Sequence, residues 1–170
     1  MNTTLEFKAS LAVDDSGLIT AMAWPFATPD RVGDMITKGA FAKASVPLPM
    51  LFGHDFNDPV GTWDSAIEQP DGLHLSGKML IDDLPRAKQV MALVKSGAVR
   101  GISVGFITKK SAPRKGGGRT ISDLELLEAS LVTIPMHSGA RVTSAKSAIE
   151  AITIAEAINR ATAALTRTIR

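Results

Sequence analysis

The stretches LFGHD at 51–55, GISVGF at 101–106 and LLEASLVTIP at 126–135 decide the fold that this sequence predicts. Each is a short apolar run that carries polar side chains: a histidine, a serine and carboxylates. A polar group left unpaired in an apolar setting costs roughly 1 to 3 kcal/mol by mutational estimates, so these groups are expected to satisfy one another. The pattern is typical of a serine hydrolase built on strands.

A relay of His54, Ser103 and a carboxylate would supply the chemistry of such an enzyme. A serine hydroxyl attacks a carbonyl only when a neutral imidazole accepts its proton, and a carboxylate then orients the imidazole. The order along the chain is no objection, because known relays occur in several orders. Glu125 and Glu128 lie on opposite faces of one predicted strand, so only one of them can point toward Ser103.

Composition predicts one compact domain. The chain has 170 residues, of which 45% are hydrophobic and 21% charged. A chain of this size buries about 70% of its unfolded surface. No run reaches the roughly 18 to 20 apolar residues of a membrane span, and the N-terminus resembles no signal peptide, so no membrane association or export is expected. Without cysteine there are no disulfides, thiolate zinc sites or cysteine nucleophiles, and no metal or cofactor is predicted.

The charge pattern argues against nucleic acid as a direct partner. The net charge is only +2, and the cations are scattered apart from the segment KKSAPRKGGGR at 109–119. We expect this segment to be a flexible, solvated loop. Its three glycines at 116–118 lack the Lys-Ser or Lys-Thr that follows in a phosphate-binding loop.

Periodicity and turn residues predict a mainly β chain. Two strands are expected on either side of a turn at 14–17, and another strand should end at His54. A hairpin is expected around a turn at 69–72, and two further strands at 98–110 and 119–135. A short helix is expected at 39–45, and a longer one follows Asp82 or Asp83, which could cap it.

Two glycines flank Ser103 in its predicted strand. Gly101 and Gly105 suggest room for a peptide substrate beside the hydroxyl, because glycine in a strand often marks the close approach of another backbone. A barrel corner with an incidental serine is the alternative. His74 alternates with leucines and is expected on the solvent side of its strand, whereas Asp55 and Asp58 are explained by the chemistry of a bend.

Seven short motifs together resemble one family. The sequence is similar to the tailed-phage prohead (capsid maturation) proteases of the HK97 type, over roughly residues 21–142. The matching motifs are GDMITKGAFA at 33–42, LFGHD, PVGTW at 59–63, DGLHLSGKM at 71–79, LVKSGAVRG at 93–101, GISVGF and LEASLVTIP at 127–135.

The resemblance implies a closed, largely antiparallel β-barrel like that of the herpesvirus proteases, flanked by a few helices. The chain is expected to divide into this barrel domain at 1–143 and a tail at 144–170, whose apolar residues at helical spacing predict an amphipathic helix. This helix could pack on the barrel, pair with another copy in a homo-oligomer, or contact scaffold or capsid. The resemblance adds that part of the tail is removed by self-cleavage. It implies a serine endopeptidase that cleaves the scaffold segment of the major capsid protein, and itself, inside the immature capsid in the bacterial cytoplasm. Ser103 would be the nucleophile, His54 the general base and Glu128 the residue that orients His54.

The chain departs from the family pattern after Pro135. The family usually continues with Ala-Asn-Pro, whereas this chain has Met136, His137 and Ser138. His137 is therefore an alternative third member of the relay, beside Glu125, although a residue of a surface loop is the simpler interpretation. The same loop could supply backbone N–H groups to the oxyanion. The alternative function is a noncatalytic capsid-assembly or scaffold protein that retains the protease fold.

Overall fold

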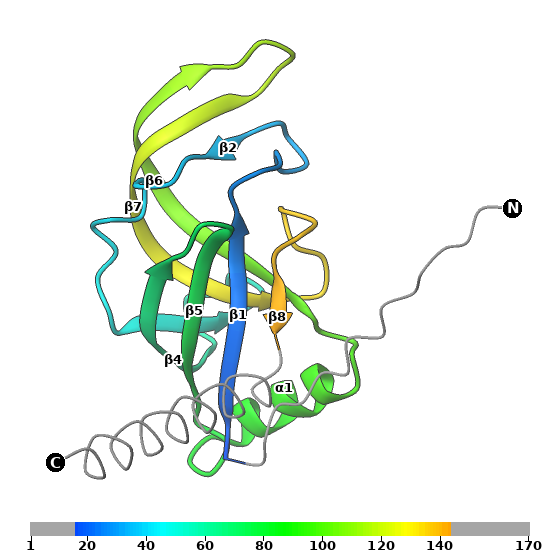
Figure 1. Ribbon diagram of the computed structural model, residues 1–170. Coiled ribbons are helices and arrows are strands. Elements are labelled where there is room, and N and C mark those ends of the chain that lie inside the picture. Colours follow the sequence, from blue (N-terminus) through cyan, green and yellow to red (C-terminus); the bar gives the residue numbers. More distant parts are fainter. Residues whose placement is uncertain (1–15, 144–170) are drawn as a thin grey trace, which may run out of the picture.

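Eight β-strands and one α-helix are formed within residues 16–143, the part of the chain that the computed structural model describes (Figure 1). The elements are β1 Leu18–Pro25, β2 Met35–Ile36, β3 Leu48–Phe52, β4 Pro59–Glu68, β5 Gly72–Met79, α1 Pro85–Lys95, β6 Gly101–Pro113, β7 Arg119–Val132 and β8 Arg141–Thr143. The strand expected before the turn at 14–17 and the helical tail at 144–170 lie outside the described residues.

Seven of the strands close into a barrel. Their order is β7-β3-β4-β5-β1-β8-β6, and β6 pairs again with β7, which completes the ring. All neighbours in the ring are antiparallel except β3 and β7. β2 adds a second parallel pairing near the start of β7, on the edge that β3 also uses and opposite β6. The predicted closed, largely antiparallel barrel is therefore confirmed. Since β3 and β7 run in the same direction, their carboxyl ends meet at one edge of the barrel.

The core is built by alternating apolar positions of the strands. In β5, for example, Leu73, Leu75 and Met79 are buried while Ser76 and Lys78 face solvent, as the period of two requires. Trp63 of β4 is fully buried, and its indole N–H donates to the carbonyl of Ala129 in β7 at 2.9 Å. This bond crosses the barrel interior and fixes β7, the strand that carries Glu128.

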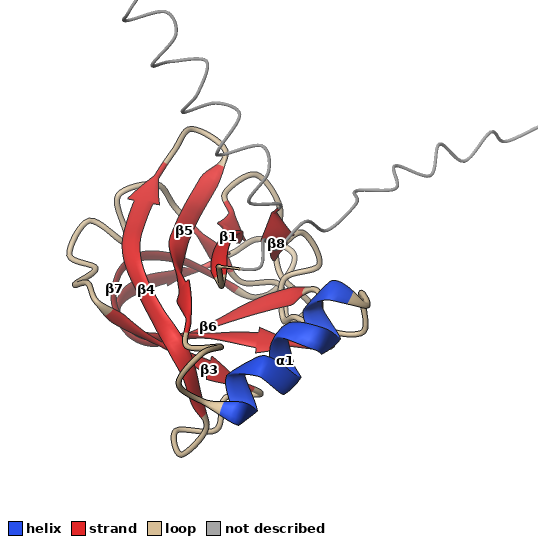
Figure 2. Ribbon diagram, turned by 90° about the horizontal axis from the view of Figure 1, so that it is seen from below, coloured by secondary structure: helices blue, strands red, loops and turns tan. Residues whose placement is uncertain are grey.

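Helix α1 packs against β4 and β5 and lies across one end of the barrel (Figure 2). The apolar stripe of the predicted helix, Ala87, Val90, Met91 and Val94, is buried as expected. Pro85 occupies the first turn, where its missing N–H is not needed. The expected cap from Asp82 or Asp83 is wrong, because Leu84 is the N-cap residue and makes no side-chain bond. No helix within residues 16–143 is long and apolar enough to cross a membrane.

The short helix expected at 39–45 is replaced by successive turns. The N–H groups of Ala40, Ala42 and Ala44 each donate to the carbonyl three residues earlier, not four. Gly39 adopts a φ of 96°, a left-handed conformation that interrupts a helix at its start. The alanines of this segment therefore give no helix, even though alanine favours one.

Most of the basic segment 109–119 is strand and not the expected flexible loop. β6 and β7 form a long hairpin that extends beyond the other strands, and only residues 114–118 form its turn (Figure 1). Lys110 pairs with Asp123 in the ladder, and the ammonium of Lys109 contacts the carboxylate of Glu125 at 2.6 Å. The cross-strand ion pair between Lys109 and Glu125 therefore supports this part of the hairpin, a stabilisation that local composition cannot reveal.

The tip of this hairpin is tied to the segment before β2. Asp34 is 6% exposed and accepts hydrogen bonds from the Arg119 backbone N–H at 2.7 Å and from the Arg119 guanidinium. The Arg114 guanidinium donates to the Gly33 carbonyl. The hydrogen bond from the Arg119 side chain holds the pKa of Asp34 below its ordinary value of 3.8, against the opposing effect of burial.

This ion pair predicts a loss of stability in acid. Because the folded-state pKa of Asp34 is depressed, its stabilisation is fully present above pH 3.8 and is lost as the pH falls through the lower folded value. We expect Asp34→Asn to reduce the free energy of unfolding by about 1 to 3 kcal/mol at pH 6, and by less at pH 3. Urea titrations at the two pH values measure this, with the exposed carboxylate variant Asp83→Asn as the control. An equal loss at both pH values would contradict it.

Candidate active site

His54 is held just beyond β3 by an unusual backbone turn. Gly53 and His54 have φ values of 66° and 63°, and His54 alone among the described non-glycine residues has a positive φ. The Gly53 N–H donates to the Leu131 carbonyl at 3.0 Å, and the His54 N–H donates to Oγ of Ser130 at 3.1 Å. The left-handed conformation costs a non-glycine residue roughly 1–2 kcal/mol. The two bonds to β7 offset this strain and direct the imidazole toward that strand.

The imidazole meets Glu128 of β7. Nδ1 of His54 lies 2.7 Å from Oε1 of Glu128, whose side chain is 2% exposed. The Ser130 hydroxyl donates to the other carboxylate oxygen, Oε2, at 2.6 Å. An ionised carboxylate can only accept, so Nδ1 of His54 carries the hydrogen, and in the neutral imidazole Nε2 is the nitrogen that can accept a proton. Because the His54 side chain is 44% exposed, this base is accessible to a substrate.

Ser103 lies on the strand at the other side of β7. It pairs directly with Ser130 in the β6–β7 ladder, and Gly105 pairs with Glu128, so all four residues share one face. Leu51 of β3 pairs with the same Ser130, which places the end of β3 on the opposite flank. Among the described residues no hydrogen bond joins Ser103 to His54. The structure thus brings His54 and Glu128 into contact, with Ser103 one strand away.

The glycines around Ser103 make room for the protein itself and not for a substrate. A Cβ at Gly105 would overlap Oε1 of Glu128, the oxygen that faces His54. A Cβ at Gly101 would lie 2.7 Å from Cδ of Pro135. The interpretation that both glycines leave space for a peptide is therefore wrong. Gly105 is required because the carboxylate occupies the volume that a side chain would fill.

Gly105→Ala is expected to displace the Glu128 carboxylate. The added methyl group would break the 2.7 Å contact with His54, so we expect the peptidase kcat proposed below to fall by about 10- to 100-fold, the equivalent of one charge-assisted hydrogen bond. Turnover of a peptide substrate measures this, with Ile107→Ala on the same strand as the control. Unchanged turnover in a folded Gly105→Ala protein would contradict it.

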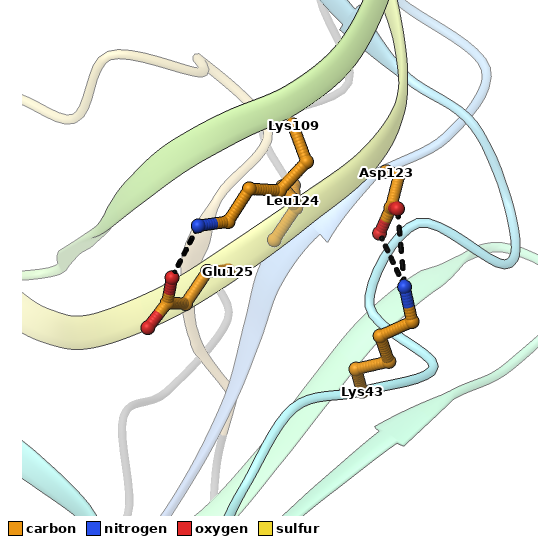
Figure 3. Close-up of a pocket in the computed structure, with 5 residues that line it drawn as sticks. All are labelled: Lys43, Lys109, Asp123, Leu124 and Glu125. Atoms are coloured by element: carbon orange, nitrogen blue, oxygen red, sulfur yellow. Dashed lines mark hydrogen bonds and ion pairs between the residues drawn. The ribbon is translucent and has the colours of Figure 1, made fainter.

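Glu125 points away from this site. Its carboxylate binds the Lys109 ammonium at 2.6 Å in a surface pocket that Lys43, Asp123 and Leu124 complete (Figure 3). Lys43 pairs there with Asp123, so the charges of this pocket are already matched. Glu128 is buried beside His54 and Glu125 is exposed beside Lys109. The expectation that they lie on opposite faces is wrong, because the β6–β7 ladder shifts register by one residue between them. Glu128 pairs with Gly105 and Glu125 with Ile107, two positions on one face of β6.

Comparison with known proteins places this fold and this set of side chains in one family. A family model of the caudovirus prohead serine proteases matches residues 3–154. The chain belongs to this family. The prohead protease family is the one that the seven motifs predicted, and its match covers the whole barrel together with the segments that carry His54, Ser103 and Glu128.

Individual relatives agree with the family assignment. The chain is 35% identical over 153 residues to a capsid polyprotein of Pseudomonas phage PAJU2, and 33% identical over 138 residues to the prohead protease of Enterobacteria phage HK97. These alignments cover 85% and 77% of this chain, but only 22% and 61% of the two relatives. The chain therefore spans less than two thirds of the length of either relative.

Among solved structures the barrel is similar to a herpesvirus protease. The match is to the crystal structure of KSHV protease in complex with a hexapeptide phosphonate inhibitor, with a TM-score of 0.51 and 14% identity. It covers 74% of this chain and 63% of the other. At this identity the likeness shows the fold alone, and it confirms the herpesvirus-protease-like barrel that the prohead protease motifs implied.

His137, where this chain departs from the usual prohead protease pattern, is buried and not the expected surface residue. It is 2% exposed and packs edge-on against Trp24 at 5.0 Å between ring centroids. Nδ1 accepts from the Gly139 N–H at 3.1 Å, so the hydrogen is on Nε2, which donates to the Thr28 carbonyl at 2.9 Å. Both ring nitrogens are thus engaged in holding the loop after β7. The geometry gives His137 a structural role away from His54.

The other polar candidates also have local partners. His74 is half-buried and binds Asp71 at 2.9 Å, and this hydrogen bond lowers the pKa of Asp71. Asp55 accepts from the Asn57 N–H, which is the bend chemistry expected of it. Asp58 instead binds the guanidinium of Arg86 on α1, so it ties this bend to the helix. Within residues 16–143 no group of three His, Cys, Asp or Glu side chains could hold a metal ion.

Ser130 is the functional candidate that sequence reasoning missed. It is fully buried and bonds both to the His54 backbone and to Glu128. The signal was present in the sequence, because Ser130 is a hydroxyl in the apolar run LEASLVTIP, two residues after Glu128 and hence on the same face. The argument that buried polar groups need partners applied to Ser130 as strongly as to Ser103.

Proposed function

We propose that the chain is a serine endopeptidase of capsid maturation, with Ser103 as nucleophile, His54 as general base and Glu128 as the residue that orients the base. The observation that carries the proposal is the 2.7 Å contact between His54 and Glu128, in which a buried carboxylate fixes the imidazole tautomer. An exposed basic nitrogen then remains beside the strand of Ser103. A noncatalytic capsid-assembly protein would not need a buried carboxylate that holds an exposed histidine in one tautomer.

The proposed reaction follows from this geometry. As Oγ of Ser103 attacks the peptide carbonyl, Nε2 of His54 takes its proton, and Glu128 stabilises the imidazolium that forms. The tetrahedral intermediate collapses when His54 returns the proton to the leaving amine, which leaves an acyl-enzyme. A water molecule, deprotonated by the same imidazole, then releases the acid product and restores Ser103.

The proposed substrate is the scaffold segment of the major capsid protein, with self-cleavage as a second reaction. The family assignment supports a role in prohead maturation, and the name of the matched PAJU2 relative, a capsid polyprotein, supports a link to capsid chains. The reaction would take place inside the immature capsid in the cytoplasm of the bacterial host. The barrel domain at 1–143 would act, and the tail at 144–170 would be cut or would contact the scaffold.

Co-expression with the capsid protein tests the proposal against the noncatalytic alternative. We expect the wild-type chain to shorten the capsid protein to discrete products, and to shorten itself, as measured by mass spectrometry of both intact proteins. The Ser103→Ala variant should leave both chains intact. Capsids that assemble with uncut capsid protein in the presence of the wild-type chain would instead favour a scaffold protein that retains the protease fold.

A further inference from the structure

We propose that Ser130 is a positioning residue of the catalytic site, so that the relay works as a closed ring of hydrogen bonds that begins and ends at His54. The proposal rests on the function proposed above. It assigns to Ser130 a role beyond burial, namely to fix at the same time the backbone of the base and the carboxylate behind it.

The direction of each bond follows from the donors available. The His54 N–H can only donate, so Ser130 Oγ accepts it at 3.1 Å. The one hydrogen of the Ser130 hydroxyl is then directed to Oε2 of Glu128 at 2.6 Å. Oε1 of the same carboxylate accepts from Nδ1 of His54 at 2.7 Å. The ring therefore runs from the His54 backbone through Ser130 and Glu128 back to the His54 imidazole.

This ring has two effects on the site. First, it secures His54 in a left-handed conformation, which a histidine adopts only when its surroundings hold it there. Second, it gives the buried carboxylate a hydrogen bond at each oxygen, which compensates for its removal from water. With both oxygens occupied, the carboxylate cannot rotate to present a different lone pair to His54.

Ser130 is also placed where it cannot act directly on a substrate. Its side chain is fully buried, and its hydroxyl is committed to Glu128 and His54. Ser103 stands opposite it in the ladder, but among residues 16–143 no hydrogen bond joins the two side chains. Ser130 therefore acts through His54 and Glu128, and its loss should lower the rate of the chemical step and leave substrate binding unchanged.

The test uses three variants at position 130. Ser130→Ala removes the hydroxyl, and Ser130→Thr and Ser130→Val have nearly the same shape but differ in the hydroxyl. We expect Ala and Val to lower kcat by about 10- to 100-fold with little change in KM, the equivalent of one charge-assisted hydrogen bond lost, and Thr to keep kcat within a few-fold of wild type. Ser65→Ala on β4, away from the ring, is the control and should behave as wild type.

A second readout separates positioning from simple stability. The proton on Nδ1 of His54 should give a resolved low-field NMR signal in the wild-type protein and in Ser130→Thr. This signal should broaden or move in Ser130→Ala and Ser130→Val, even at temperatures where circular dichroism shows both to be folded. The proposal is overturned if Val and Thr have equal kcat, or if Ala lowers only the melting temperature. Failure of the proposed function would look different, because the wild-type chain itself would then show no peptidase activity.

Discussion

Replacing Ser103 with alanine is expected to lower kcat for peptide cleavage by roughly 10⁴- to 10⁶-fold, as the loss of a serine nucleophile does in other proteases. The alanine cannot form the acyl-enzyme, so His54 and Glu128 are left with only water to activate. The barrel should be unaffected, since Ser103 makes no hydrogen bond within the described residues that its removal would break. The measurement is single-turnover cleavage of a peptide or of co-expressed capsid protein.

Ser111→Ala is the matched control for this loss. Ser111 lies on the same strand as Ser103, in the exposed outer part of the β6–β7 hairpin. The Ser111→Ala variant should cleave the substrate at the wild-type rate. Equal activity of Ser103→Ala and wild type would remove Ser103 from the mechanism, whereas loss of activity in both variants would point to damage of the strand.

Replacing Glu128 with glutamine is expected to lower kcat by about 10³- to 10⁴-fold, which is the effect of removing the charge of the orienting carboxylate in other relays. The amide is nearly isosteric but uncharged, so it no longer stabilises the imidazolium. Its NH₂ group can also donate to Nδ1 of His54, which would move the ring hydrogen to Nε2 and remove the base. KM should change little, because the buried carboxylate does not reach a substrate.

Glu125→Gln is the control for this second loss, since Glu125 lies on the same strand and pairs with Lys109 at the surface. It should keep wild-type activity, and so should His137→Gln, provided that the loop after β7 keeps its place. A greater loss in Glu125→Gln than in Glu128→Gln would move the orienting role to Glu125.

The barrel could be predicted because its determinants are local and repeated. The alternation of buried and exposed positions in β4 and β5, and the Pro85 start and Gly97 end of α1, can each be read from a few neighbouring residues. The approximate positions of His54 at a strand end and of Ser103 within a strand follow from the same patterns. Closure of the ring and its likeness to herpesvirus proteases came from the family resemblance and not from periodicity.

What could not be predicted depends on contacts between distant segments. Gly105 is a glycine because Glu128 fills its space, and the two positions are 23 residues apart in sequence but paired in the ladder. Residues 109–113 of the basic segment are strand because they pair with β7, where the Lys109 ammonium binds the carboxylate of Glu125. His137 is buried because its Nε2 donates to the Thr28 carbonyl and its ring packs against Trp24. Each outcome requires the register of two strands or two loops, which composition does not contain.

The central claim is that Ser103 is a nucleophile activated by His54, and covalent labelling tests it most directly. A fluorophosphonate probe reacts with activated serines by forming a bond from the serine oxygen to phosphorus and releasing fluoride. Peptide mapping by mass spectrometry of the labelled wild-type chain should find one adduct, on Ser103, and none in His54→Ala. An adduct on a different serine, or no adduct in wild-type chain that is folded, would contradict the account.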